Sequence, residues 1–268
     1  MENPSYNIKD VYKEISTIDG YFCEKKDGSE FNNGLIAQYC PYNSTFESGF
    51  CMNYLYKASS GVINLLDNLK KYNLEYDKLA EYAILFLSYK LKQHSQYKST
   101  NLNTVYTKDI EINKYYNNKI KDNGPTYKEI IDKKKNLMNT NEISKFNDTF
   151  SILVLLYNEI KKNNRDCTKC LQKANDFAKN FENLNEDSNI NGNTSYSKLL
   201  STLSNDYDNF KIYFAEKCSG CKDIPTLPKV KTPPSKLIPA LSTFSVIPVF
   251  LGIAYKVNNK ELKTIKFL

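Results

Sequence analysis

The chain has 268 residues, of which 41% are hydrophobic and 13% aromatic, so it is long enough to bury a sizeable core. Only nine Gly and nine Pro interrupt it, which favours long helices over a β fold with many turns. The net charge of +7 does not indicate a nucleic-acid partner, because residues 222–268 hold eight Lys against Asp223 and Glu261, a net of +6, which leaves +1 for residues 1–221.

The first third of the chain contains three segments with helical periodicity. Four apolar residues near the N-terminus follow the i, i+3, i+4, i+7 spacing of one helix face: Ile8, Val11, Tyr12 and Ile15. Further helices are predicted over residues 51–69 and 74–93. The centre of the latter, Tyr82–Tyr89, is apolar nearly all round, so we expect this helix to be buried in the middle of the domain.

The rest of the polar part of the chain is predicted to form helices separated by two looser segments. The predicted helices cover residues 126–137, 143–162, 167–184 and 195–217. Residues 95–125, which are rich in Asn, Ser, Thr and Lys, are predicted to form a loose helix with loops. Residues 183–195 are polar and rich in helix breakers, which predicts a surface loop.

The composition changes after Cys221. Six of the nine prolines follow it, and closely spaced prolines cannot continue a helix, so residues 222–236 are predicted to be an extended, semi-stiff stalk. The next stretch, Leu237–Tyr255, carries no charge. A helix of that length rises about 28 Å, close to the hydrocarbon core of a bilayer at about 30 Å, so we predict a single transmembrane helix. Residues 256–268 then form a short basic tail.

The orientation of this span stays open. Both flanks carry a net charge of +3, with four Lys and one acidic residue in each of residues 222–236 and 256–268, so the positive-inside rule favours neither orientation. The N-terminal sequence MENPSYNIKDVYKEI lacks the apolar stretch of a secretory signal peptide. A C-terminal span could therefore also be a tail anchor that leaves the domain in the cytosol.

The cysteines help to decide whether the domain lies in an oxidising or a reducing compartment. There are seven: Cys23, Cys40, Cys51, Cys167, Cys170, Cys218 and Cys221. The pairs CTKC and CSGC could supply four thiolates for zinc, but they are further apart in sequence than in a compact zinc module. A redox-active CxxC normally follows a strand of a βαβ unit, a pattern that the sequence lacks. We favour structural disulfides in an oxidising compartment. The alternatives are zinc ligands, a redox pair or buried reduced thiols. Because the number of cysteines is odd, at least one thiol should remain outside the disulfides.

No catalytic constellation emerges. His94 is the only histidine, and its polar context KQHSQYKS indicates a surface residue. Phosphate-binding and nucleophile-elbow glycine motifs are absent from the sequence. Carboxylate pairs such as Asp206 and Asp208 lie among Asn and Ser, which indicates solvated surface charge. We therefore expect no enzyme, no cofactor and no bound metal.

Several elements occur in a specific order. SYSKLLSTLSNDYDNFK at residues 195–211 precedes the CSGC pair, and FLGIAYK follows at residues 250–256. Tyr39-Cys40-Pro41 and Cys51 lie in the N-terminal part. In these features the chain resembles the Plasmodium interspersed repeat (PIR) variant antigens, over nearly its whole length.

The resemblance implies a multigene family of exported proteins of the infected red cell, with a helical, cysteine-containing domain and one C-terminal span. For this chain it implies a mostly α ectodomain at residues 1–221, the stalk and the span, and a role in host interaction or immune evasion without catalysis. The partners would be the lipid bilayer and a host protein of unspecified identity. The competing hypothesis is a tail-anchored, cytosol-facing module that binds zinc.

Overall fold

The computed structural model describes residues 7–22, 33–41, 50–160, 167–218 and 220–233. All of them belong to one compact unit that ends at Pro233. None of the helices in these ranges is long and apolar enough to cross a bilayer. The predicted span Leu237–Tyr255 and the tail at 256–268 lie outside the described residues, as does Cys23.

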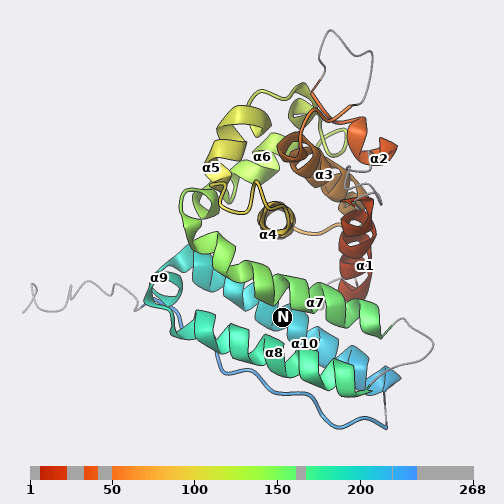
Figure 1. Cartoon of the computed structure of the whole chain (residues 1–268), viewed down its shortest axis with the longest axis vertical. Coiled ribbons are helices and arrows are strands. Elements are labelled where there is room, and N and C mark those ends of the chain that lie inside the picture. Colours follow the sequence, from red (N-terminus) through yellow and green to blue (C-terminus); the bar gives the residue numbers. More distant parts are fainter. Residues whose placement is uncertain (1–6, 23–32, 42–49, 161–166, 219, 234–268) are drawn as a thin grey trace, which may run out of the picture. The chain divides into compact units, whose positions relative to one another are not determined.

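The described part is mostly helical, as predicted (Figure 1). The longer helices are α1 (Ile8–Asp19), α3 (Tyr54–Leu69), α4 (Tyr76–Gln93), α7 (Asn147–Glu159), α8 (Cys167–Glu186) and α10 (Thr194–Lys217). Short α-helices lie between them: α2 (Gly34–Ala37), α5 (Leu102–Val105), α6 (Tyr127–Asp132) and α9 (Ser188–Asn191). The remaining short turns are η1 (Gly20–Phe22), η2 (Lys70–Tyr72), η3 (Tyr106–Ile110), η4 (Lys114–Asn117), η5 (Lys135–Met138) and η6 (Asn141–Phe146).

Helix α4 occupies the centre of the upper part of the unit, where Figure 1 shows it end-on among α1, α3, α6 and α7. It packs against α3, α6 and α7. Every residue from Leu79 to Leu91 is buried, which confirms the prediction made from the apolar run Tyr82–Tyr89. A helix that is hydrophobic on all sides can be stable only where neighbours cover all of its faces.

Helix α1 confirms the periodicity of the N-terminal segment. The Asn7 side chain accepts a hydrogen bond from the backbone N–H of Lys9 and so caps the first turn. The four residues predicted to share a face are all buried: Ile8, Val11, Tyr12 and Ile15. Through this face α1 packs against α3 and α7.

A second group of helices is formed by α7, α8 and α10, which lie side by side in the lower part of Figure 1. The stripe predicted on the long C-terminal helix is buried in α10: Leu199, Leu200, Leu203, Tyr207 and Phe210. The ring of Tyr207 stacks on that of Phe177 of α8, with centroids 4.5 Å apart. Aromatic stacking therefore joins α8 to α10.

Two predicted helices are divided in the structure. The segment predicted as one helix at 126–137 consists of α6, which ends at Asp132, and the separate turn η5. Between them lies Lys134, whose ammonium is 2.9 Å from Glu81 and 3.1 Å from Asp77 of α4. These ion pairs hold the turn against α4. Likewise, the helix predicted at 143–162 begins as the tighter turn η6 and becomes α-helical at Asn147.

The surface loop predicted at 183–195 is largely helical instead. Helix α8 continues to Glu186, and α9 follows after a single residue. The polar residues that predicted a loop are helix caps: Asp187 accepts from the N–H of Asn189, and Asn193 accepts from the N–H groups of Ser195 and Tyr196. Ile190 is fully buried between them. The looser segment 95–125 also contributes to the core, through residues such as Val105 and Tyr116.

Residues 222–233 form no helix, in keeping with their prolines. They are not detached from the domain, because the compact unit includes them. Ile224 is buried, and Leu227 and Val230 pack against the core. Figure 1 shows this segment running along α8 from the end of α10 toward α9. The residues predicted as a stalk are thus, up to Pro233, part of the folded unit.

Candidate functional site

Two disulfides join cysteines that were candidates in the sequence. One links Cys40 to Cys51, and the other links Cys167 to Cys221. The second bond fastens the N-terminal turn of α8 to the residues that follow α10. In a chain-entropy description, closing these loops stabilises the fold by about 3 and about 4 kcal/mol respectively, because the second loop is longer.

The zinc hypothesis is wrong for these residues. It requires four thiolates from the CTKC and CSGC pairs. The disulfide between Cys167 and Cys221 takes one cysteine from each pair, so four thiolates are not present together. Cys170 and Cys218 are both buried. Among the described residues, no three His, Cys, Asp or Glu side chains are grouped as metal ligands would be.

A buried polar cluster surrounds Asp206 of α10. The hydroxyl groups of Tyr12 and Tyr82 each donate to the same carboxylate oxygen at 2.9 Å. The hydroxyl of Tyr157 donates to the backbone carbonyl of Asp206 at 2.8 Å. Three tyrosines from α1, α4 and α7 therefore converge on one residue of α10.

Burial raises the pKa of Asp206 to about 6, while the positive charge of Lys78 and the two tyrosine hydroxyls oppose the rise and Glu81 adds to it. Tyr12, whose pKa burial raises well above the usual value for a tyrosine, remains protonated and continues to donate. The tyrosine hydroxyls of the cluster are used as donors to Asp206, and the cluster is buried. Its geometry suits the joining of four helices.

The expectation that Asp206 is a solvated surface charge is therefore wrong. The signal that could have corrected it is its position three residues after Leu203 and directly before Tyr207, on the apolar stripe of α10. Asp208, named with it, is exposed as expected.

A second acid, Asp109, is fully buried in the π-helical turn η3. Burial raises its pKa to about 6, and Ser59 and Asn113 beside it oppose that rise. The hydroxyl of Tyr116 donates to the backbone carbonyl of Ser59 at 2.7 Å, which ties this region to α3. Sequence reasoning missed Asp109 as a buried acid, because it treated residues 95–125 as a loose, polar segment; the apolar residues Val105, Tyr106 and Ile110 around it were the available signal.

The only histidine contacts two aromatic rings, which also stack on each other with centroids 6.0 Å apart. The centroid of the His94 ring lies 4.3 Å from that of Tyr54 and 5.0 Å from that of Tyr97. Its Nδ1 accepts from the N–H of Gln96 at 3.2 Å. His94 therefore lies at the end of α4 in an aromatic contact, where the sequence predicted a solvated surface residue.

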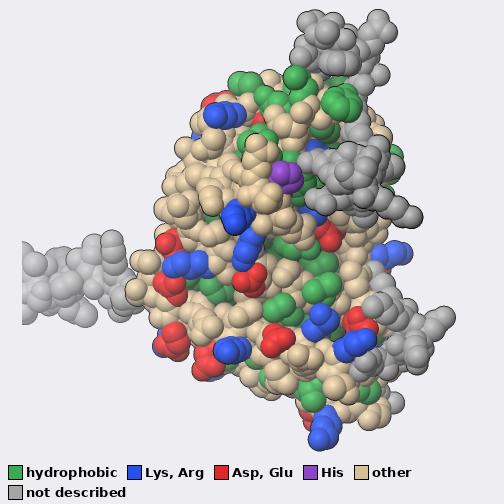
Figure 2. All heavy atoms as spheres, in the orientation of Figure 1, with side chains coloured by type: hydrophobic (Ala, Val, Ile, Leu, Met, Phe, Trp, Pro, Cys, Tyr) green, Lys and Arg blue, Asp and Glu red, His purple; other side chains and the backbone are tan. Residues whose placement is uncertain are grey.

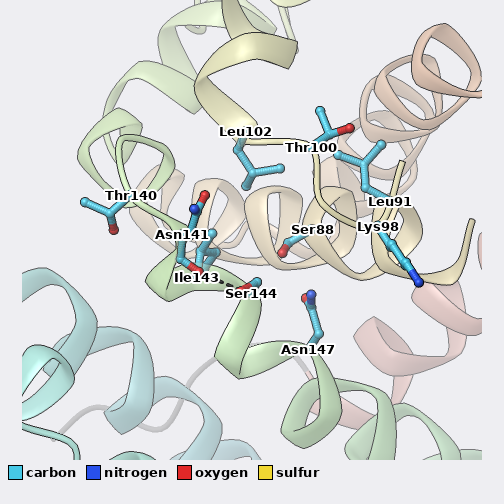
Figure 3. A pocket seen from close by; sticks show the side chains of 10 residues that line it. All are labelled: Ser88, Leu91, Lys98, Thr100, Leu102, Thr140, Asn141, Ile143, Ser144 and Asn147. Carbon is cyan, nitrogen blue, oxygen red and sulfur yellow. Dashed lines mark hydrogen bonds between the residues drawn. The ribbon is translucent and has the colours of Figure 1, made fainter. Parts of the chain in front are cut away.

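A small recess lies where α4, α5, η6 and the start of α7 meet (Figure 3). The Ser88 hydroxyl and the amide of Asn147 point into it. The amide of Asn147 is buried and makes no hydrogen bond to another described residue. The recess has a volume of about 20 Å³, which is room for one water molecule. Such a water would satisfy the amide, and a larger ligand would not fit.

The described surface carries side chains of both charges and a few exposed hydrophobic residues. On the face shown in Figure 2, acidic and basic side chains are interspersed in the lower part. Exposed large hydrophobic residues occur near α2 and the segment that leads into α3: Leu35, Phe50 and Met52. Ile112, just after η3, is 71% exposed.

Comparison with known proteins completes the description of the site. A sequence model of the family described as "Plasmodium variant antigen protein Cir/Yir/Bir" matches residues 12–256. The chain belongs to this family. A solved structure described as "Structure of a Plasmodium PIR protein ectodomain" is 34% identical in sequence and has a TM-score of 0.59. The alignment covers 83% of this chain and all of that one. Among curated proteins, none matches the chain.

Both comparisons confirm the resemblance drawn from the sequence motifs at residues 195–211 and 250–256. The family assignment gives the coarse function, a variant antigen, and the solved relative gives the fold of a PIR ectodomain. The buried tyrosine cluster and the two disulfides are then elements of the scaffold of this antigen.

Proposed function

We propose that this PIR family chain is a single-pass membrane antigen, exported to the infected red cell or displayed at the parasite surface, that presents residues 1–233 as its ectodomain. The observation that carries the proposal is the extent of the family match. It continues to residue 256 and so includes Leu237–Tyr255, whereas the relative described as an ectodomain corresponds to 83% of the chain. The apolar stretch thus lies within the family sequence but beyond the described fold.

The two disulfides support an ectodomain outside the cytosol. Disulfides persist in oxidising compartments and are rare in the cytosol, where thiols are kept reduced. One disulfide lies in the N-terminal part of the unit, and the other joins the start of α8 to the residues after α10. This argument favours the antigen over a cytosol-facing, tail-anchored protein.

The proposed role is binding or antigenic display without catalysis. The buried acid Asp206 is occupied by tyrosine hydroxyls, and the ring of His94 is packed against Tyr54 and Tyr97. We propose that a host protein, if it binds, contacts the exposed part of residues 95–125, where Ile112 is accessible. The capped helix α9 makes residues 183–195 a less variable surface than a loop would be.

The test uses the full chain in infected cells. We expect it to stay in the membrane pellet after alkaline extraction, and a variant that lacks residues 237–255 to be released into the supernatant. Protease added to intact cells should then remove the ectodomain of the full chain. A chain that is extracted by alkali would refute the proposed membrane span. An ectodomain that stays intact until the red-cell membrane is opened would refute display on the red cell, and one that also resists protease added to released intact parasites would refute surface display altogether.

A further inference from the structure

The extended segment at residues 222–231, here called the strap, is fastened differently at its two ends. At its start, Cys221 is covalently bound to Cys167 at the beginning of α8. At its end, the strap is held by polar contacts from the last turn of α8. The first attachment is permanent under oxidising conditions, and the second can open.

The backbone at the end of the strap is held by one side chain, that of Asn185. Its Nδ2 donates to the backbone carbonyl of Lys229 at 2.9 Å, and its Oδ1 accepts from the backbone N–H of Lys231 at 2.7 Å. Asn185 is only 1% exposed. Its own backbone carbonyl accepts from the side chain of Asn191 at 3.0 Å, which fixes the end of α8.

This pattern is that of a strand neighbour. In a parallel bridge, one residue donates to a carbonyl and accepts from the N–H two residues further along the partner. The carboxamide of Asn185 offers the same donor and acceptor as a peptide group, so it replaces one residue of a missing strand. Aspartate would lose the donor and place a negative charge against the Lys229 carbonyl. The chemistry of this contact therefore selects asparagine.

Asn185 is not the only attachment of the strap, because Ile224 is buried and Leu227 and Val230 pack against the core. The strap also makes three further polar contacts. The Tyr207 hydroxyl donates to the carbonyl of Pro225 at 3.0 Å, and the ammonium of Lys211 donates to Thr226 Oγ1 at 2.8 Å. The ammonium of Lys231 pairs with Glu186, but both side chains are more than half exposed, and such surface pairs contribute little. The buried polar contact at the end of the strap is therefore the one that Asn185 makes, next to the apolar packing of Val230.

We propose that Asn185 is a clamp that sets the length of the tether between the folded unit and the membrane, and that the Cys167–Cys221 disulfide limits how far the tether can lengthen. With the clamp closed, the chain from Lys231 to the predicted span at Leu237 reaches at most about 20 Å. With the strap released to Cys221, the reach becomes about 55 Å. This inference rests on the proposed anchoring for its biological meaning, but the clamp can be tested independently.

The experiment is limited proteolysis of the full chain in detergent with an enzyme that cuts after lysine, followed by mass spectrometry. We expect Asn185→Ala to raise the rate of cleavage after Lys229 at least tenfold, with a smaller rise after Lys222. Exchange of the Lys231 N–H should accelerate by a similar factor. The matched control is Asn183→Ala, the same change at an exposed position of the same helix, which should leave both rates unchanged.

A second variant keeps the test valid if Asn185→Ala does not fold. Lys231→Pro removes the N–H that Asn185 accepts and leaves α8 intact, so it should also raise cleavage after Lys229. Equal cleavage after Lys229 in the wild type and in both variants would overturn the clamp. Flotation of the full chain with liposomes reports the anchoring separately: a chain that does not float but has a protected Lys229 refutes the anchoring and retains the clamp.

Discussion

Asp206 shows how one residue determines the packing of several helices. Its carboxylate is buried among tyrosines of α1 and α4, and its backbone carbonyl accepts from a tyrosine of α7. A buried acid without partners would be costly, but here two hydroxyl donors satisfy the same oxygen. The cluster is therefore a structural feature with a measurable dependence on pH.

The first prediction concerns that pH dependence. Because burial raises the pKa of Asp206 to about 6 from the ordinary 3.8, the folded state binds this proton more tightly than the unfolded state does. The stabilisation is complete below about pH 4 and is lost as the pH rises through 6, amounting to about 3 kcal/mol. We expect Asp206→Asn to remove this component from the free energy of unfolding, measured with urea between pH 4 and pH 7.

The control for this prediction is Asp208→Asn on the exposed side of α10. In this variant, the free energy of unfolding should change with pH as it does in the wild type. Asp109, whose pKa burial also raises to about 6, contributes to the slope of both proteins and cancels in the comparison. If the free energy of unfolding of Asp206→Asn changed with pH as much as that of the wild type, Asp206 would not be the source of this pH dependence.

At the scale of elements, the region from α8 to α10 shows why polar residues do not always mark loops. Asp187 and Asn193 lie at helix starts and accept hydrogen bonds from backbone N–H groups that would otherwise have no partner. The composition of such a segment is the same for a loop and for a run of caps. Only the burial of Ile190 and Leu184 separates the two.

The second prediction follows from this cap. Asn193→Ala should lower the free energy of unfolding by about 1 kcal/mol, because the first N–H groups of α10 lose their acceptor. Asn189→Ala, at an exposed asparagine of α9, should change it by less than about 0.5 kcal/mol. Urea unfolding measures both, and equal effects would argue that residues 183–195 behave as a loop after all.

At the scale of the whole molecule, the two disulfides differ in the length of chain that they close. The Cys167–Cys221 bond closes a loop of 54 residues, which includes α8, α9 and α10. It also anchors the strap, so its loss should both destabilise the fold and free the start of the tether. The Cys40–Cys51 bond closes a loop of 11 residues near α2 and α3.

The third prediction compares the two bonds. Replacing both cysteines of a pair by serine should destabilise the chain by about 4 kcal/mol for Cys167 and Cys221 and by about 3 kcal/mol for Cys40 and Cys51. Peptide mapping of the non-reduced chain should first identify these two cross-linked pairs. A different pairing in the map, or a larger loss for the shorter loop, would refute the prediction.

Much of the fold could be predicted because the signals are local. The spacing of Ile8, Val11, Tyr12 and Ile15 requires a helix face, and the run around Tyr82 requires burial on all sides. The break after Asp132 was not predicted, and the ion pair that Lys134 makes there with Glu81 of α4 is a contact between residues far apart in sequence. The contacts of Asn185 with the strap were not predicted either, because its partners lie in a segment whose prolines indicated a detached stalk.

The sequence by itself determined that the chain is mostly helical, that it carries an apolar stretch at 237–255, and which family its motifs resemble, because periodicity, length and motif order are properties of the chain alone. The tertiary structure decided which cysteines pair, that Asp206 is buried, and that residues 222–233 are part of the folded unit. These depend on contacts between residues far apart in sequence, and such contacts are fixed only when helices pack together.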